Sequence, residues 1–188
     1  QISEARNKAI EKASGEILSF LDVDDFWVID KLTYQVKLFE DKSVGIVYGN
    51  FFTLNQESNK IHKFFNKILP RGKIVNNLLK HYNVGLLTLC IRKFFYDQLE
   101  YKFHDNLVLM GDTDLVIRLS LICNADVVQD PVATYRIHNQ SFTLKNNTII
   151  FKELDSWLKK MNVYRSSYLK NNFYLVENFY AKIFFNNL

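Results

Sequence analysis

Three carboxylates stand close together at the end of an apolar run. Residues 16–21 are short and largely apolar, which is typical of a buried strand, and Asp22, Asp24 and Asp25 follow directly. Carboxylates crowded in this way repel one another, so they cost stability unless a cation or a donor-rich ligand compensates. Because ligands of open α/β sheets bind just beyond the carboxyl ends of strands, these residues are candidates to hold Mg²⁺ or Mn²⁺ with a phosphate group. The alternative is a polar turn whose acids cap the next helix.

Two further candidates lie downstream. Asp112 and Asp114 precede an amphipathic pattern that predicts a helix over 112–124. One acid can be the helix N-cap and the other is then free to act as a general base; the alternative is that both cap. His138 ends a predicted strand at 132–137. It is a structural histidine unless it returns to the acid cluster, where it would be a metal ligand.

Helices and strands must alternate to position these side chains. Helical spacing and capping residues predict helices over 3–14, 30–40, 72–82, 92–99 and 112–124. Short apolar runs predict strands over 16–21, 44–48, 86–91, 127–128 and 132–137, with a hairpin over 51–54 and 61–65. This alternation predicts an α/β fold with a mainly parallel sheet flanked by helices.

Composition and charge exclude several classes of protein. The chain has 188 residues and 48% hydrophobic content, which excludes a disordered tail and a disulfide scaffold. Residues 1–144 hold 17 basic and 17 acidic side chains, and this neutral balance argues against a nucleic-acid-binding surface. Cys90 and Cys123 lie in apolar runs and are expected to be buried, reduced thiols of a cytoplasmic protein.

The C-terminal segment differs from this body. Residues 145–188 hold 7 basic and 3 acidic side chains and therefore carry the net charge of +4. We expect a domain over 1–144 and a helical tail over 145–188, with two helices broken near Asn162. Eight aromatic side chains lie between Tyr164 and Phe185. The tail could pack on the body, form a homodimer through 148–188, or dock on the inner face of a membrane, where basic and aromatic residues are both favoured.

Two segments resemble HAD phosphatases. Residues 20–24 match their strand ending in D-x-D, and residues 107–113 match their late G-D motif. The likeness then fails, because position 26 is Phe where that family has Thr or Val, and no acid follows three or four residues after Asp112. A phosphatase is therefore the less favoured alternative.

The linear order of motifs resembles family 2 glycosyltransferases of the GT-A fold more closely. Residues 5–10 are similar to A-R-N-x-G-I, and residues 13–27 are similar to A-x-G-E followed by L-D-x-D-D-x-W. The resemblance continues to about residue 142 through the segments 91–93, 103–105, 111–115 and 135–138. It departs at Ala9, where the family has Gly, and at Gly111, where the family has an acid.

The resemblance implies a role for each candidate. Asp24 would bind a divalent cation, Mn²⁺ or Mg²⁺, that bridges the diphosphate of a nucleotide-sugar donor, and Asp22 would contact the ribose or a metal-bound water. Asp112 would be the base for an inverting transfer to a hydroxyl group of a glycan or lipid-linked acceptor, as in bacterial surface polysaccharide synthesis. His138 would add a metal or diphosphate ligand, and Arg6 would lie near the nucleotide.

The beginning of the chain departs most from the family. The strand, helix and second strand that precede A-R-N in the family are missing here, since this motif begins at residue 5. We therefore expect an N-terminally truncated GT-A-like domain with a weakened nucleobase pocket, an open sheet edge at 16–21 and weak transfer activity. The alternative is an inactive fragment that only packs or binds a partner.

Overall fold

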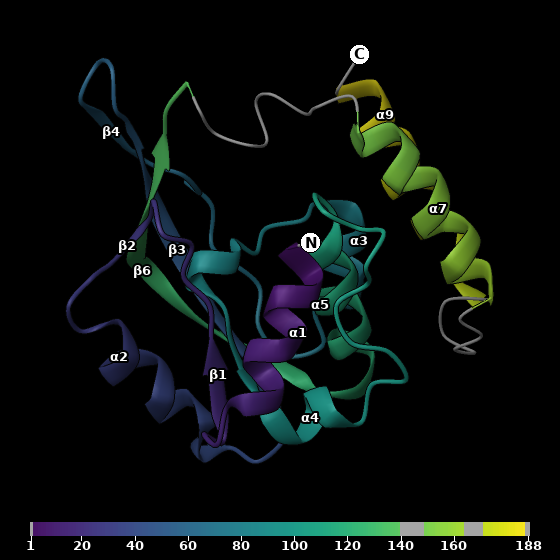
Figure 1. The fold of residues 1–188 in the computed structure, drawn as a ribbon, viewed down its shortest axis with the longest axis horizontal. Helices are drawn as coiled ribbons and strands as arrows, with labels where there is room; N and C mark the ends of the chain where they lie inside the picture. The colour runs from purple at the N-terminus through teal and green to yellow at the C-terminus, as the bar shows by residue number, and fades with distance from the viewer. Residues whose placement is uncertain (1, 140–148, 164–170, 187–188) are drawn as a thin grey trace.

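A mixed sheet forms the centre of the molecule, with helices on both faces (Figure 1). The computed structural model describes residues 2–139, 149–163 and 171–186. The strand order is β1-β5-β3-β6-β2, and β4 pairs with β3 off this path. The strands are β1 (Ile17–Ser19), β2 (Phe26–Trp27), β3 (Val44–Asn55), β4 (Lys60–Lys63), β5 (Cys90–Arg92) and β6 (Asn124–Ile137).

Most helices gather on one side of this sheet. Figure 1 shows α1, α3, α4 and α5 on one side, α2 on the other, and α7 and α9 outside α3 and α5. The helices are α1 (Ile2–Lys12), α2 (Lys31–Lys37), α3 (Val75–Lys80), α4 (Lys93–Asp97), α5 (Gly111–Ile122), α7 (Ile149–Val163) and α9 (Phe173–Asn186), with short 3-10 turns at Leu38–Glu40 and Leu86–Thr88.

The predicted α/β fold is confirmed, but the sheet is mixed rather than mainly parallel. β3 and β6 form a long parallel pair, from Val44 opposite Asn124 to Asn55 opposite Ile137. The pairs β1–β5, β3–β5, β2–β6 and β3–β4 are all antiparallel. The apolar run at residues 86–91 begins as a 3-10 turn and ends as a strand that runs back between β1 and β3. An apolar run carries no direction, so the sequence could not reveal this reversal.

Strand β3 divides the core between the two faces of the sheet. Ile46 and Tyr48 join the large apolar cluster on the side of α5, whereas Val44 and Val47 pack with Phe39 on the other side. Ile46, Val47 and Tyr48 alternate with the two-residue period of a strand, and Val44 departs from it next to a register shift between Val44 and Ile46. The far half of β3 continues beyond the core as the predicted hairpin with β4. The core therefore surrounds the first half of β3, and the hairpin extends the same sheet beyond the core.

The C-terminal helices share the core of the body. Leu154 and Trp157 of α7 and Phe179 of α9 are almost fully buried within the large cluster. The C-terminal helices therefore pack on the body, as one of the alternatives predicted. In the described ranges, no helix is long and apolar enough to cross a membrane. The predicted boundary at 144/145 and the aromatic residues Tyr164 and Tyr168 lie outside the described residues.

The two thiols behave as predicted. Cys90 and Cys123 are both free and buried. Burial raises the pKa of Cys123 to about 12, so this thiol stays protonated and acts as a small apolar group.

Candidate functional site

The acid-rich segment forms a tight turn between β1 and β2. The amide of Asp25 donates a hydrogen bond of 3.1 Å to the carbonyl of Asp22. Phe26 then lies opposite Thr134 in the antiparallel pair β2–β6. Strand β2 has only two residues, which is too short for a periodic pattern, and the sequence analysis missed it. This short pairing brings the acids to the far end of β6.

A buried lysine anchors the residues that flank the acid turn. The indole Nε1 of Trp27 donates to the carbonyl of Leu87 at 2.9 Å, and Lys31 Nζ lies 4.3 Å from the centre of the Trp27 ring. Lys31 Nζ also donates to Ser19 Oγ at 2.9 Å. Burial lowers the pKa of Lys31. The residues on both sides of the acid turn are thus anchored in the protein.

The carboxylates of the turn point in two directions. Asp25 is buried and accepts a 3.0 Å hydrogen bond from the backbone amide of Arg136. Burial, aided by repulsion from Asp24 and Asp22, raises the pKa of Asp25 to about 6, although the Arg136 amide acts in the opposite direction. Asp24 instead faces His138, with 3.1 Å between Oδ2 and Nε2. The structure therefore brings His138 to the acid turn, as the metal-ligand alternative requires.

Asp112 lies in the first turn of α5 and faces a cavity. Its Oδ1 accepts a 2.8 Å hydrogen bond from the amide of Thr113. Burial raises the pKa of Asp112 to about 6, although the Thr113 amide and the Arg6 guanidinium act in the opposite direction. A carboxyl group that titrates near 6 is ionised at neutral pH and has more affinity for a proton than an ordinary aspartate, as general-base catalysis requires.

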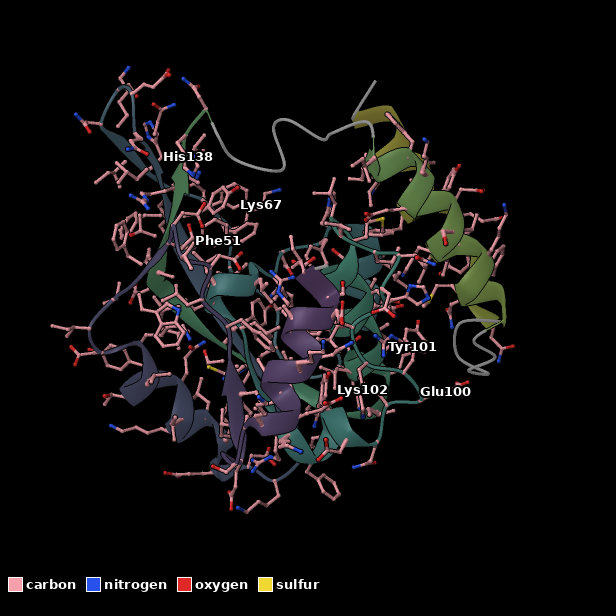
Figure 2. All side chains as sticks on the ribbon, in the orientation of Figure 1. Phe51, Lys67, Glu100, Tyr101, Lys102 and His138 are labelled. Atoms are coloured by element: carbon pink, nitrogen blue, oxygen red, sulfur yellow. The ribbon has the colours of Figure 1, made fainter. Side chains whose placement is uncertain are left out.

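Asp114 has a structural role. It is fully buried, and Arg118 donates to its Oδ2 from Nη2 at 2.7 Å and from Nε at 3.0 Å. Tyr101 donates its hydroxyl to Oδ1 at 3.0 Å, and Arg118 also bonds the carbonyls of Tyr101 and Lys102. Figure 2 shows Tyr101 and Lys102 on the loop beside α5. The N-cap of α5 is Met110 and no side chain caps it, so the expectation that Asp112 or Asp114 is the N-cap is wrong.

One cavity collects residues from both acid motifs. Its volume is ≈ 300 Å³, and its polar side is formed by Arg6, Asp22, Asp25 and Asp112. Arg6 Nη2 lies 3.2 Å from Asp22 Oδ1. Residues from α1, the acid turn and α5 thus meet at one place, although up to about 100 positions separate them in sequence. The sequence analysis gave Asp25 no role of its own, although it lies in the acid run.

The other wall of this cavity is apolar. The rings of Phe51 and Phe64 stack with 4.5 Å between their centres and 17° between their planes. The amide of Phe64 donates to the carbonyl of Phe51 at 2.9 Å, which holds the segment after β4 against β3. Phe64 remains 51% exposed. Figure 2 places Phe51 on the sheet below His138, so the apolar wall and the acid turn share one end of the sheet.

Asp24 and His138 line a neighbouring hollow rather than this cavity. In residues 2–139, 149–163 and 171–186, no three metal-binding side chains converge. The pair still suits Mn²⁺ or Mg²⁺, because it offers a carboxylate oxygen and an imidazole nitrogen 3.1 Å apart, with 35% and 23% of these side chains exposed. Such ions keep several water ligands and complete their shell with substrate phosphates, so a site with few protein ligands fits them.

Asn7 bonds helix α1 to the loop at Phe103, and this attachment sets the position of the neighbouring Arg6. The Asn7 side chain donates to the Phe103 carbonyl at 2.9 Å and accepts from the Phe103 amide at 3.0 Å. Ser3 Oγ donates to the Leu107 carbonyl at 3.2 Å. The sequence analysis quoted Asn7 within a motif without a role, since its partners lie about 100 residues away and only the fold brings them together.

Comparison with known proteins gives consistent results. The glycosyl transferase family 2 model matches residues 1–99. The chain is 32% identical over 99 residues to "UDP-Glc:alpha-D-GlcNAc-diphosphoundecaprenol beta-1,3-glucosyltransferase WfgD" of Escherichia coli, a match that covers 53% of this chain and 38% of that protein. It is 28% identical over 160 residues to the "Putative teichuronic acid biosynthesis glycosyltransferase TuaG" of Bacillus subtilis, with 80% and 61% covered.

The fold is also similar to a solved structure. Residues 1–349 of S. aureus TarS superpose with a TM-score of 0.60 at 13% identity, over 83% of this chain and 43% of that one. The chain thus spans between 38% and 61% of the length of these relatives. The likeness to TarS supports the fold, and the family match sets the phosphatase alternative aside. Because the family model accounts for more than half of its residues, the chain belongs to glycosyltransferase family 2.

Proposed function

We propose that this chain carries the catalytic site of a metal-dependent, inverting glycosyltransferase. The observation that carries the proposal is the meeting of Arg6, Asp22 and Asp112 in one cavity. A transfer of this kind needs a base for the acceptor and positive charge near the leaving group. The cavity supplies a carboxylate on α5 and a guanidinium on α1.

Asp112 is the base in this mechanism. Its carboxylate takes the proton of an acceptor hydroxyl group while that oxygen attacks the anomeric carbon of the donor sugar. The bond between this carbon and the diphosphate oxygen breaks in the same displacement, and the configuration is inverted. Arg6 lies where it can attract the departing diphosphate, and Asp22 can accept a hydrogen bond from the donor ribose. With the pKa of Asp112 at about 6, the base form dominates above that pH.

Asp24 and His138 are the residues that would hold Mn²⁺ or Mg²⁺. A bound divalent cation would offset the charge on the leaving nucleoside diphosphate. The hydrogen bond between Asp24 and His138 orients both side chains toward one hollow beside the cavity. Asp22 precedes Asp24 by two residues and lines the cavity that contains Asp112. The donor would therefore extend from the hollow beside Asp24 into this cavity.

The relatives suggest the substrates. The name of the E. coli relative specifies a UDP-sugar donor and a sugar linked by diphosphate to undecaprenol, and TarS has been solved in complex with UDP. We extend both classes to this chain, with a UDP-sugar as donor and a glycan or lipid-linked sugar as acceptor. The apolar wall around Phe51 and Phe64 is compatible with an acceptor that has a large apolar part. We also propose that the protein acts at the inner face of the membrane and contacts the membrane peripherally.

A thermal-shift titration tests the donor site. The chain is melted with UDP, GDP or CMP, each with and without Mn²⁺, beside the variants Asp24→Ala and Asp30→Ala. A ligand at 100 times its dissociation constant stabilises by about 2.7 kcal/mol. We expect UDP to raise the melting temperature only with Mn²⁺, and Asp24→Ala alone to remove the effect. Asp30 is an exposed acid without a side-chain cap bond, so it controls for the loss of one charge. Stabilisation by UDP that survives in Asp24→Ala would contradict the proposed metal site.

A further inference from the structure

A buried carboxylate of the C-terminal segment bonds the backbone just before α5. Glu153 of α7 is 4% exposed, and it belongs to none of the motifs discussed above. Its Oε1 accepts from the amide of Val108 at 2.7 Å, and its Oε2 accepts from the amides of Leu109 and Met110, both at 2.9 Å. Hydrogen bonds to an ionised carboxylate are roughly twice as strong as neutral ones. Glu153 thus holds three consecutive peptide groups.

These three peptide groups lead directly into the site. Val108 and Leu109 line the cavity, Met110 is the N-cap of α5, and Asp112 lies two residues further on. The first amides of a helix lack partners within it, and the N-terminus attracts negative charge. No side chain of the N-cap residue supplies such a partner here. Glu153 bonds the three amides that precede the helix, and it thereby places a carboxylate from a different helix near this N-terminus.

Glu153 is itself held on a rigid element. Its neighbour Leu154 is fully buried and Trp157, one turn later on α7, is 1% exposed. The ring of Trp157 lies 5.4 Å from that of Phe179 on α9. Figure 1 shows α7 running alongside the part of the molecule that contains α5. A carboxylate fixed in this way can set the position of the backbone it bonds.

We infer that Glu153 is a positioning residue for glycosyl transfer. It fixes residues 108–110, and through them it sets the wall of the cavity and the place of Asp112. The inference rests on the proposed function of Asp112. It makes the helical segment 149–163 part of the catalytic unit, since the base is held in place from that segment.

The first test does not depend on turnover. Glu153→Gln keeps the shape of the side chain, removes its charge and directs an amide donor at backbone donors. The matched control is Asp155→Asn on the same helix, whose carboxylate is exposed and pairs only with Lys159 among the bonds the structure describes. NMR is used to measure amide exchange at residues 108–110 and the carboxyl titration of Asp112. We expect faster exchange in Glu153→Gln alone. We also expect a lower pKa of Asp112 in this variant, because burial is the main cause of the raised pKa and residues 108–110 hold the carboxyl in its buried place. Unchanged exchange and titration would overturn the inference.

The second test measures turnover per binding site. Misplacing a reacting group by about 1 Å can lower the rate about 100-fold. We therefore expect kcat to fall about that much in Glu153→Gln. The UDP dissociation constant and the binding stoichiometry should not change, because the described hydrogen bonds of Glu153 go to residues 108–110 and not to Arg6, Asp22 or Asp24, the residues proposed to hold the donor. General destabilisation would lower the binding stoichiometry as well. A kcat equal to that of Asp155→Asn would overturn the inference.

The two proposals fail in different ways. If the unmodified chain binds UDP but transfers no sugar, the proposed function fails, and the role of Glu153 in placing Asp112 is judged by the exchange and titration results alone. If Glu153→Gln does not fold, Glu153→Asp replaces it. This variant keeps the charge and shortens the side chain by one methylene, so the same changes are expected at smaller size.

Discussion

Asp112→Asn should stabilise the protein while it removes activity. The pKa of Asp112 rises from 3.8 to about 6 in the folded chain, mainly because the carboxyl is buried. At 1.36 kcal/mol per pKa unit, a rise of about two units makes the ionised form about 3 kcal/mol less stable in the folded state. Asparagine has nearly the same shape and its oxygen can still accept from the Thr113 amide. We therefore expect the free energy of unfolding to increase by about 3 kcal/mol at neutral pH.

The sign of this effect depends on pH in a defined way. Because the folded-state pKa is raised, the folded protein loses stability as Asp112 ionises. The penalty is full above pH 6 and vanishes below the unfolded pKa of 3.8. The gain in Asp112→Asn should thus be complete at pH 8, decline through pH 6 to 4, and be absent at pH 3.5 if the protein still folds there.

Urea unfolding at a series of pH values measures this gain. The unmodified chain, Asp112→Asn and the surface control Asp155→Asn are compared, and unchanged m-values confirm that the variants unfold in the same way. General-base catalysis contributes about 10²–10⁴-fold, so turnover of Asp112→Asn should fall by that factor. A variant that is less stable at pH 8, or a gain that is equal at pH 4 and pH 8, would refute the assignment of Asp112 as a buried base.

Three other predictions test the remaining features. Asp114→Asn should lower the free energy of unfolding by about 3–5 kcal/mol, because it leaves Arg118 buried without its charge partner; a loss below 1 kcal/mol in urea unfolding would contradict this structural role. His138→Ala should weaken Mn²⁺-dependent binding of UDP in calorimetry and leave the melting temperature of the free chain nearly unchanged, since the imidazole is partly exposed. Trp157→Ala should destabilise the whole domain by about 3–5 kcal/mol in a single transition, and a separate early transition of the C-terminal helices would argue against a shared core.

Patterns within short segments predicted the local elements well. The acid run after an apolar strand, the helix after Gly111 and the hairpin around residues 55–60 all rest on neighbouring residues, and the structure contains each of them. The helix is buried on nearly all sides rather than amphipathic, because α7 and α9 add to the core that surrounds it. The order of motifs was also informative, because it indicated the family that the comparison with known proteins then showed. Asp22 and Asp112 were predicted in separate motifs, and the structure places them on one cavity.

Features that depend on distant partners could not be predicted in this way. The direction of β5 and the existence of β2 depend on which strand lies beside each, and periodicity does not encode this. Asp114 and Asp112 are both aspartates in the same helical turn. Asp114 pairs with buried Arg118 and has a structural role, whereas Asp112 faces a cavity and is available for chemistry. Glu153 gives no signal in the sequence, because an acid in an amphipathic helix is usually on its solvated face.

The long pairing of β3 with β6 has a consequence for folding. It joins segments about 80 residues apart, and chains dominated by such distant contacts fold slowly because closing the loop costs entropy before the contacts form. The contacts of the acid turn with Arg136 and His138 can form only after β6 has docked. The ligand site is therefore expected to be completed only after β6 has docked, and nucleotide binding during refolding should develop no earlier than the pairing of β3 with β6.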